Sequence, residues 1–257
     1  MKKDTPELDS NAYLKNSAEI KMRRKTPIQL EINLTQPTWG GARDGAGRKR
    51  LATKHDASHG PRPEHVARFP VHVVLRTRSE VRRLRRGYVL RKVRRALHVV
   101  AVREAGFRVV HMSIQHNHLH LLVEAENKLA LSRGMQAFAI SAARAINRSQ
   151  NRTGKVFALR YHATTISSRR QTRHALAYVL NNWRRHEEDR RGGRRAARAL
   201  VDPYSSGVSF EGWSVGAFDV PDDYVPLAVS AARTWLLREG WKLYGAIEPR
   251  EVPGKLR

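Results

Sequence analysis

Three histidines lie within five positions of one apolar segment, Gln115–Glu124. Side chains of a β-strand alternate between its two faces, so His118 and His120 point to the same side, opposite to the aliphatic residues around them. Two neutral imidazoles on one face can hold a single divalent metal ion. We therefore predict that His118 and His120 are metal ligands. His116 lies at the expected turn before the strand and is left outside the ligand set.

A helix predicted over residues 171–188 offers a third ligand and a nucleophile. Tyr178 and Asn182 are four residues apart in this segment, so they are neighbours on one helix face. The apolar residues of the helix fall on its far side. A metal held by two imidazoles and an amide carbonyl would polarise a phosphodiester. The Tyr178 hydroxyl could then attack the phosphate and form a covalent phosphotyrosine.

The charge of the chain indicates a polyanionic partner. Its 257 residues include 49 Lys and Arg against 23 Asp and Glu, which gives a formal charge of +26. A charge of this size favours nucleic acid as the partner and predicts binding that weakens with salt. The sequence has no cysteine, which excludes disulfides and thiolate chemistry. It has no apolar run long enough for a membrane span, so we expect a cytoplasmic protein that is nucleoid-associated when bound to DNA.

The site residues must be positioned by a mixed α and β fold. Apolar periodicity predicts the order β-α-β-β-α-β followed by one more helix. This order is typical of an α+β, ferredoxin-like fold, an antiparallel sheet with helices on one face, to which a catalytic C-terminal helix is added. The predicted strands are residues 70–76, 107–115, 117–124 and 155–166, and the predicted helices are residues 79–105, 129–149 and 171–188.

Composition divides the chain into three parts. Residues 1–66 are predicted to be a basic, largely disordered N-terminal arm. Residues 67–188 form the catalytic domain, and residues 189–257 are a linker and a small C-terminal extension that is less basic. A Gly- and Arg-rich run in the arm resembles an AT-hook-like segment, and a flexible linker is an equal alternative. Its candidate DNA contacts are Arg43, Arg48, Lys49 and Arg50.

Four sequence blocks carry a resemblance to a known family. They are Phe69–Arg76, Asn117–Glu124, Val156–His162 and Tyr178–Asn182, which occur in order within residues 66–187. Together they resemble the single-tyrosine HUH transposases, most closely the REP-associated tyrosine transposases of bacteria. His118-Leu119-His120 looks like the metal-binding His–hydrophobe–His motif of this family.

The resemblance implies a specific reaction. Tyr178 falls where the family has its nucleophile, and Asn182 falls where it has an amide ligand. The implied activity is cleavage and rejoining of single-stranded DNA beside a hairpin through a 5′-phosphotyrosine, with Mg²⁺ or Mn²⁺ as cofactor. Relatives act as dimers, and whether this chain forms a homodimer is left open. The residues expected to contact DNA are Arg82, Arg83, Arg85, Arg86, Arg91, Lys92, Arg94, Arg95, Arg160, Arg184 and Arg185.

Two alternatives use the same residues differently. The chain is alternatively a domesticated, non-mobile protein that binds a repeat hairpin without cutting it. A third reading is a nicking enzyme of the relaxase or replication-initiator type, which would apply similar chemistry to another substrate. Detection of a covalent protein–DNA adduct would distinguish the two catalytic hypotheses from the hypothesis of a protein that only binds DNA.

Overall fold

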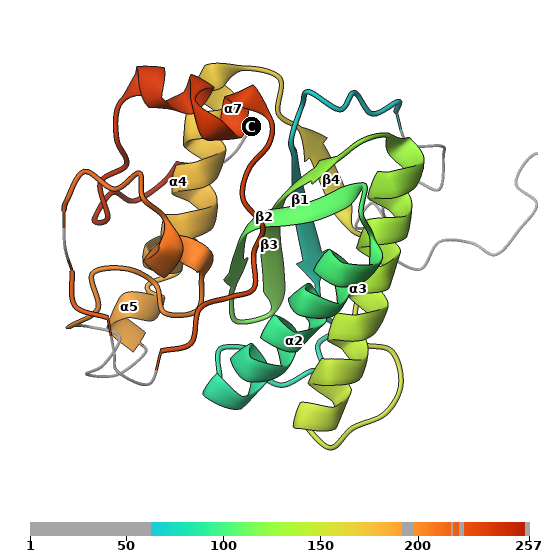
Figure 1. Ribbon diagram of the computed structural model, residues 1–257. Helices are drawn as coiled ribbons and strands as arrows, with labels where there is room; N and C mark the ends of the chain where they lie inside the picture. Colours follow the sequence, from blue (N-terminus) through green and yellow to red (C-terminus); the bar gives the residue numbers. More distant parts are fainter. Residues whose placement is uncertain (1–62, 192–197, 217, 221–223, 255–257) are drawn as a thin grey trace, which may run out of the picture. The chain divides into compact units, whose positions relative to one another are not determined.

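The sheet at the centre of the fold has four strands. They are β1 (Val71–Arg76), β2 (Phe107–Ile114), β3 (His118–Ala125) and β4 (His162–Thr165), in the order β2-β3-β1-β4. Each neighbouring pair is antiparallel. With the helices that connect the strands, this is the predicted β-α-β-β-α-β arrangement, and the α+β, ferredoxin-like prediction is confirmed (Figure 1).

The computed structural model of this chain describes residues 63–191, 198–216, 218–220 and 224–254. These residues all fall within one unit, residues 54–257. The predicted arm lies almost entirely outside the described residues, and so do its candidate DNA contacts Arg43, Arg48, Lys49 and Arg50. The proposed boundaries after residues 66 and 188 stay predictions. In the part of the chain that is described, no helix is both long enough and apolar enough to span a membrane.

Two long helices cover one face of the sheet. α2 (Gly87–Arg103) and α3 (Lys128–Ser149) bury their apolar stripes against the odd-numbered residues of β1 and β3. The close approach of α3 to the sheet requires a glycine, because a Cβ on Gly134 would lie 2.1 Å from the Phe107 ring. Burial of this continuous aliphatic layer is the main source of stability for such a fold.

The other face of the sheet is covered by α4 (Arg169–Arg185) and the C-terminal extension. α4 buries residues around most of its circumference because it lies between the sheet and the later segments. Trp183 is fully buried here, and Trp213, Trp241 and Ile247 belong to the same apolar cluster. The extension contains the short helices α5 (Glu188–Arg191), η1 (Ser206–Ser209), α7 (Trp235–Arg238) and η2 (Gly240–Tyr244). It is therefore part of the folded domain.

The first predicted helix begins eight residues later than expected. Val81 and Leu84 are buried at helical spacing, but residues 79–86 are not helical, and several of their backbone groups bond to other elements. The Leu84 N–H donates to the His116 carbonyl, and Gln150 bonds both the N–H and the C=O of Arg82. These tertiary bonds replace the helical ones, so α2 starts at Gly87.

The fourth predicted strand is also shorter than expected. The strand predicted over residues 155–166 pairs with β1 only from His162 to Thr165, and its earlier part touches the sheet edge through a single bridge between Phe157 and Thr77. Helix α3 and the strands β1, β2 and β3 lie close to their predicted ranges.

Candidate active site

His118 and His120 lie on the face of β3 that α4 covers. Leu119, on the opposite face, is in the core under α2 and α3, so the predicted alternation is observed. The two imidazoles are buried, and their Nε2 atoms lie 2.9 Å apart. Strand alternation alone accounts for this convergence, because residues i and i+2 project from the same face. The turn residue His116 is exposed.

Helix α4 brings the predicted tyrosine and asparagine to the same place. The Nδ2 atom of Asn182 lies 2.8 Å from Nε2 of His120. The Tyr178 ring stands edge-on to the His120 ring, with a centroid distance of 5.2 Å. Tyr178 is half-buried, and its hydroxyl forms no hydrogen bond with any other described residue. All four candidate groups thus meet within a single chain.

A fourth histidine, His72 on β1, was not identified from the sequence. Its Nε2 lies 3.0 Å from Nδ1 of His120, and the two rings stack at a centroid distance of 5.2 Å. His72 is also in edge contact with Tyr178. The available signal was its position between Val71 and Val73, which places it on the face opposite to the core. Using that signal required knowing that β1 pairs with β3.

The hydrogen bonds define which ring nitrogens carry protons. The carboxamide oxygen of Asn117 only accepts, so Nδ1 of His118, 2.8 Å away, donates to it and leaves Nε2 bare. The Asn182 NH₂ donates to Nε2 of His120, so His120 carries its proton on Nδ1, where it can donate to His72. The unprotonated Nε2 atoms of His118 and His120 therefore face each other, 2.9 Å apart. A shared cation would relieve this unfavourable contact.

The electrostatics keep these rings neutral. Burial, followed by the charges of His186, Arg76 and neighbouring imidazoles, lowers the pKa of His118 from 6.5 to about 4. Burial, followed by the charge of His162, lowers the pKa of His72 to about 4. Burial likewise holds the pKa of His120 well below 6.5. Neutral imidazole is the form that binds a metal.

The donor set fits a divalent metal with two imidazoles and an amide. Among the described residues, no group of three or more His, Cys, Asp or Glu side chains is arranged to hold a metal. Asn182 would supply the third donor, because its amide lies beside the paired imidazoles. The Oδ1 atom of Asn182 is buried and has no hydrogen-bond partner among the described residues. Rotation of this amide by half a turn would direct Oδ1 toward the paired Nε2 atoms.

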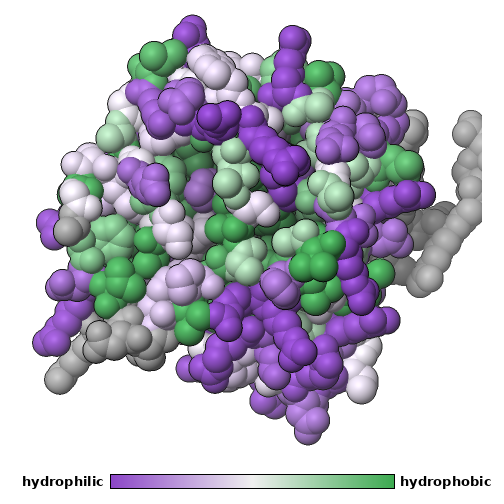
Figure 2. Space-filling model, in the orientation of Figure 1, coloured by the Kyte–Doolittle hydropathy of each residue, from purple (hydrophilic) through white to green (hydrophobic). Residues whose placement is uncertain are grey.

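The predicted DNA contacts divide into exposed and internally bonded residues. Arg85 is buried, pairs in a bidentate manner with Asp202, and donates to the Ile114 carbonyl, so its prediction as a DNA contact is wrong. Arg83 pairs with the buried Glu188. The residues that remain at the surface are Arg82, Arg86, Arg91, Lys92, Arg95 and Arg160, with Arg94 half-buried. Figure 2 shows hydrophilic side chains gathered over α2.

Two other predicted DNA contacts instead hold the C-terminal extension. Arg184 donates to the carbonyls of Pro249 and Leu200, and Arg185 donates to the Pro253 carbonyl. These guanidinium groups bridge α4 to the extension, so neither is free as predicted. The carbonyls that they bind lie at least 16 residues away along the chain, so no local sequence pattern indicates these contacts.

The candidate residues lie within a segment that matches a known family. Residues 65–182 match the family model described as "Transposase IS200 like". These residues, a little under half of the chain, therefore belong to the IS200-like transposase family, which acts in DNA transposition. The match includes His118, His120, Tyr178 and Asn182, and it ends before the C-terminal extension.

Two solved structures were also matched, whereas no curated protein matches this chain. A REP-associated tyrosine transposase bound to a REP hairpin is 13% identical, with a TM-score of 0.47 over 69% of this chain and 99% of that chain. A protein from Deinococcus radiodurans R1 named as a transposase is 17% identical, with a TM-score of 0.33 over 44% of this chain and 87% of that chain. The family assignment rests on the sequence match.

Proposed function

We propose that this transposase cuts and rejoins single-stranded DNA beside a hairpin, with Tyr178 as the nucleophile. The observation that carries the proposal is the convergence of the Tyr178 phenol, the paired imidazoles of His118 and His120, and the amide of Asn182. The half-buried Tyr178 hydroxyl has no hydrogen bond within the described residues, which leaves it available to a substrate. A purely structural tyrosine in such a setting would usually be bonded through its hydroxyl.

The reaction is a transesterification at phosphorus. The Tyr178 oxygen attacks the scissile phosphate, a new O–P bond forms, and the bond to the 3′ oxygen breaks. The phenol proton leaves to water, and the departing 3′ oxygen takes one up. The products are a free 3′ hydroxyl and a 5′-phosphotyrosine. Attack by another 3′ hydroxyl reverses the step and releases Tyr178, so rejoining needs no nucleotide cofactor.

The residues that would hold a metal are His118, His120 and Asn182. A bound Mg²⁺ or Mn²⁺ would polarise the phosphate and neutralise charge that develops on it. Imidazole ligands favour Mn²⁺ over Mg²⁺. His72 would act by orienting His120, because an acceptor at Nδ1 keeps the Nε2 lone pair directed toward the metal position.

Exposed basic residues near the site would hold the DNA strand. Arg76 pairs in register with His118 across β1 and β3 and is exposed, so its guanidinium can reach a phosphate at the site. Arg91, Lys92 and Arg95 on α2 are also exposed and would contact the backbone further along. The hairpin as substrate is proposed from the four sequence blocks shared with REP-associated transposases.

A covalent adduct tests the proposal. The full chain is incubated with labelled hairpin-containing single-stranded DNA, with and without Mn²⁺, and analysed on a denaturing gel. We expect a metal-dependent adduct that disappears in Tyr178→Phe and persists in the control Tyr244→Phe, which alters an exposed tyrosine in η2. An undiminished adduct in Tyr178→Phe would exclude this nucleophile. Hairpin binding without any adduct would favour the domesticated, non-catalytic alternative.

A further inference from the structure

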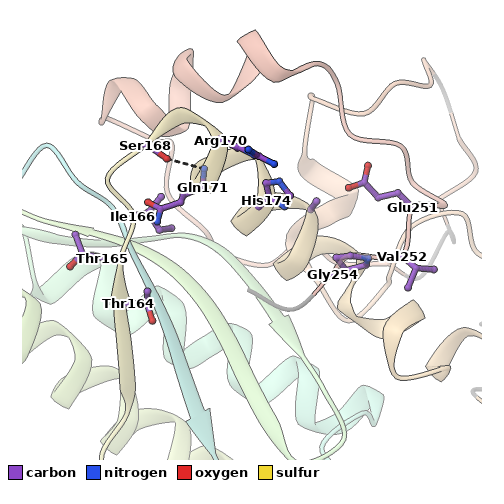
Figure 3. Close-up of a pocket in the computed structure, with 12 residues that line it drawn as sticks. Thr164, Thr165, Ile166, Ser168, Arg170, Gln171, His174, Glu251, Val252 and Gly254 are labelled. Atoms are coloured by element: carbon purple, nitrogen blue, oxygen red, sulfur yellow. Dashed lines mark hydrogen bonds between the residues drawn. The ribbon is translucent and has the colours of Figure 1, made fainter. Parts of the chain in front are cut away.

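A cavity of about 580 Å³ lies beside the candidate active site, and neither the family match nor the proposed reaction assigns it a role. Three segments form its walls, as Figure 3 shows: β4, the first turns of α4, and the C-terminal residues Glu251–Gly254. Its volume is within the range of about 300–1,000 Å³ that is usual for small-ligand sites. The C-terminal wall lies outside the segment that matches the family.

The position of the cavity links it to the nucleophile. Gln171 and His174 line it, and they precede Tyr178 and Asn182 along one stripe of α4, because their spacing is three, four and four residues. On the sheet, the lining residue Thr164 pairs in register with His72, which touches both His120 and Tyr178. The cavity is thus one helical turn from Tyr178 on α4 and one strand away from His72 on the sheet.

The lining suits a flat group with apolar faces and a polar edge. Ile166, Ala177, Val252 and Pro253 supply apolar surface, whereas Gln171 and His174 supply hydrogen-bonding groups. The Gln171 Oε1 atom accepts from Ser167, and its NH₂ group has no partner among the described residues, so it can donate to a ligand. A nucleobase has both properties, and Arg170 at the same cavity can contact its phosphate.

The C-terminal wall is fixed in place by α4. Arg173 donates to both carboxylate oxygens of Glu251, at 2.6 and 2.9 Å, and to the Ala246 carbonyl. Arg185 holds the Pro253 carbonyl. The Glu251 carboxylate is neutralised by this bidentate pair, so it does not repel a polyanion. The C-terminal wall is thus tied to α4 at two of its residues.

We propose that this cavity binds one nucleobase of the single-stranded DNA that lies at Tyr178, and that it gives the enzyme a base preference at that position. The proposal rests on the proposed function, since it takes the same strand as its ligand. It adds a site for reading sequence, to which the C-terminal extension contributes.

Sequence selection tests this inference without any need for cleavage. The probe is a constant DNA hairpin with eight randomised single-stranded nucleotides on its 5′ side, retained by the full chain carrying Tyr178→Phe and then sequenced. We expect one position to show a base preference of about fivefold or more. Gln171→Ala, His174→Ala and Val252→Ala are then each added singly to that chain. Each variant should lose this preference, while the base preferences at the other positions stay unchanged. All three side chains are exposed, so folding should be preserved.

The matched controls are Gln136→Ala and His98→Ala, which alter exposed residues of α3 and α2 and should leave the selected sequences unchanged. A preference that survives in all three cavity variants would overturn the inference, as would an equal weakening at every position or the lack of any preference in the parent. Because the assay detects binding by a chain that lacks the nucleophile, a failed adduct assay and a failed selection are distinguishable results.

Discussion

Asn182 and His120 meet with Nδ2 and Nε2 2.8 Å apart, although 62 residues separate them in the chain. Asn182 is fully buried, and the contact joins the last turns of α4 to the first half of β3. The position of α4 over the sheet therefore sets the geometry of the site. This position depends on apolar packing beneath the helix and on the C-terminal extension that covers it.

Replacement of both histidines of β3 should remove the metal site. In a His118→Ala, His120→Ala double variant we expect the affinity for Mn²⁺ to fall by more than about 100-fold, because two of the three proposed donors are lost. Isothermal titration calorimetry measures this directly. His116→Ala, at the exposed turn beside them, is the control and should bind as the parent does. Equal affinities in the parent and the double variant would remove both histidines as ligands.

Replacement of His72 should show whether this residue orients His120 or only packs against it. His72→Phe keeps a buried ring but loses the acceptor for Nδ1 of His120, so Mn²⁺ affinity should fall by about 10- to 100-fold. His72→Gln offers an amide oxygen as acceptor and should restore part of the affinity. Thermal unfolding of the metal-free variants reports any change in packing. If both variants bind Mn²⁺ as the parent does, His72 has no orienting role.

Local sequence patterns predicted the features that depend on the geometry of a single strand or a single helix. Strand alternation placed His118 and His120 on one face, and helical spacing placed Tyr178 and Asn182 together. Both predictions need only the geometry of the backbone. The site also requires β3 and α4 to lie together. The sequence supported this contact only through the order of the four blocks that resemble the family.

Features that depend on distant partners were not predictable in this way. Arg85 looks like its basic neighbours, and only the folded chain brings it to Asp202, 117 residues later. The start of α2 was misplaced because buried residues at helical spacing occur in an irregular segment. Residues 246–254 have no periodicity, and their hydrogen bonds with α4 are made largely through backbone carbonyls, which no sequence pattern reveals.

The buried pair of Arg85 and Asp202 should contribute strongly to stability. Asp202→Ala leaves the Arg85 guanidinium buried without its carboxylate, so we expect the free energy of unfolding to fall by about 3–5 kcal/mol. Urea unfolding followed by circular dichroism measures the change. Glu239→Ala, which breaks an exposed pair with Lys242, is the control and should cost at most about 1 kcal/mol. Equal losses in the two variants would contradict this account.

Acid should destabilise the metal-free protein below neutral pH. Desolvation lowers the pKa of the partly buried His111 to about 4, whereas in the unfolded chain this pKa is near 6.5. Between these values the unfolded state binds more protons, so the free energy of unfolding decreases as the pH is lowered from about 6.5 to about 4. His72 and His118 add in the same direction.

This account can be checked with a variant that cannot titrate. In His111→Gln the number of protons taken up on unfolding within that pH range should decrease by about one. Urea unfolding at several pH values gives this number from the slope. Gln can still bond with Ser206, the partner of His111. An unchanged slope would mean that His111 titrates normally in the folded protein.

The salt dependence of DNA binding should distinguish exposed arginines from internally bonded ones. Each phosphate contact adds about 0.7 to 0.9 to the slope of log K against log salt concentration. Arg91→Ala and Arg95→Ala on α2 should each lower the slope by about that amount and leave unfolding nearly unchanged. Arg184→Ala should do the opposite, since its guanidinium bonds to Pro249, Leu200 and Asp189 rather than to solvent. If Arg184→Ala lowers the slope as much as Arg91→Ala does, the internal role assigned to this arginine is wrong.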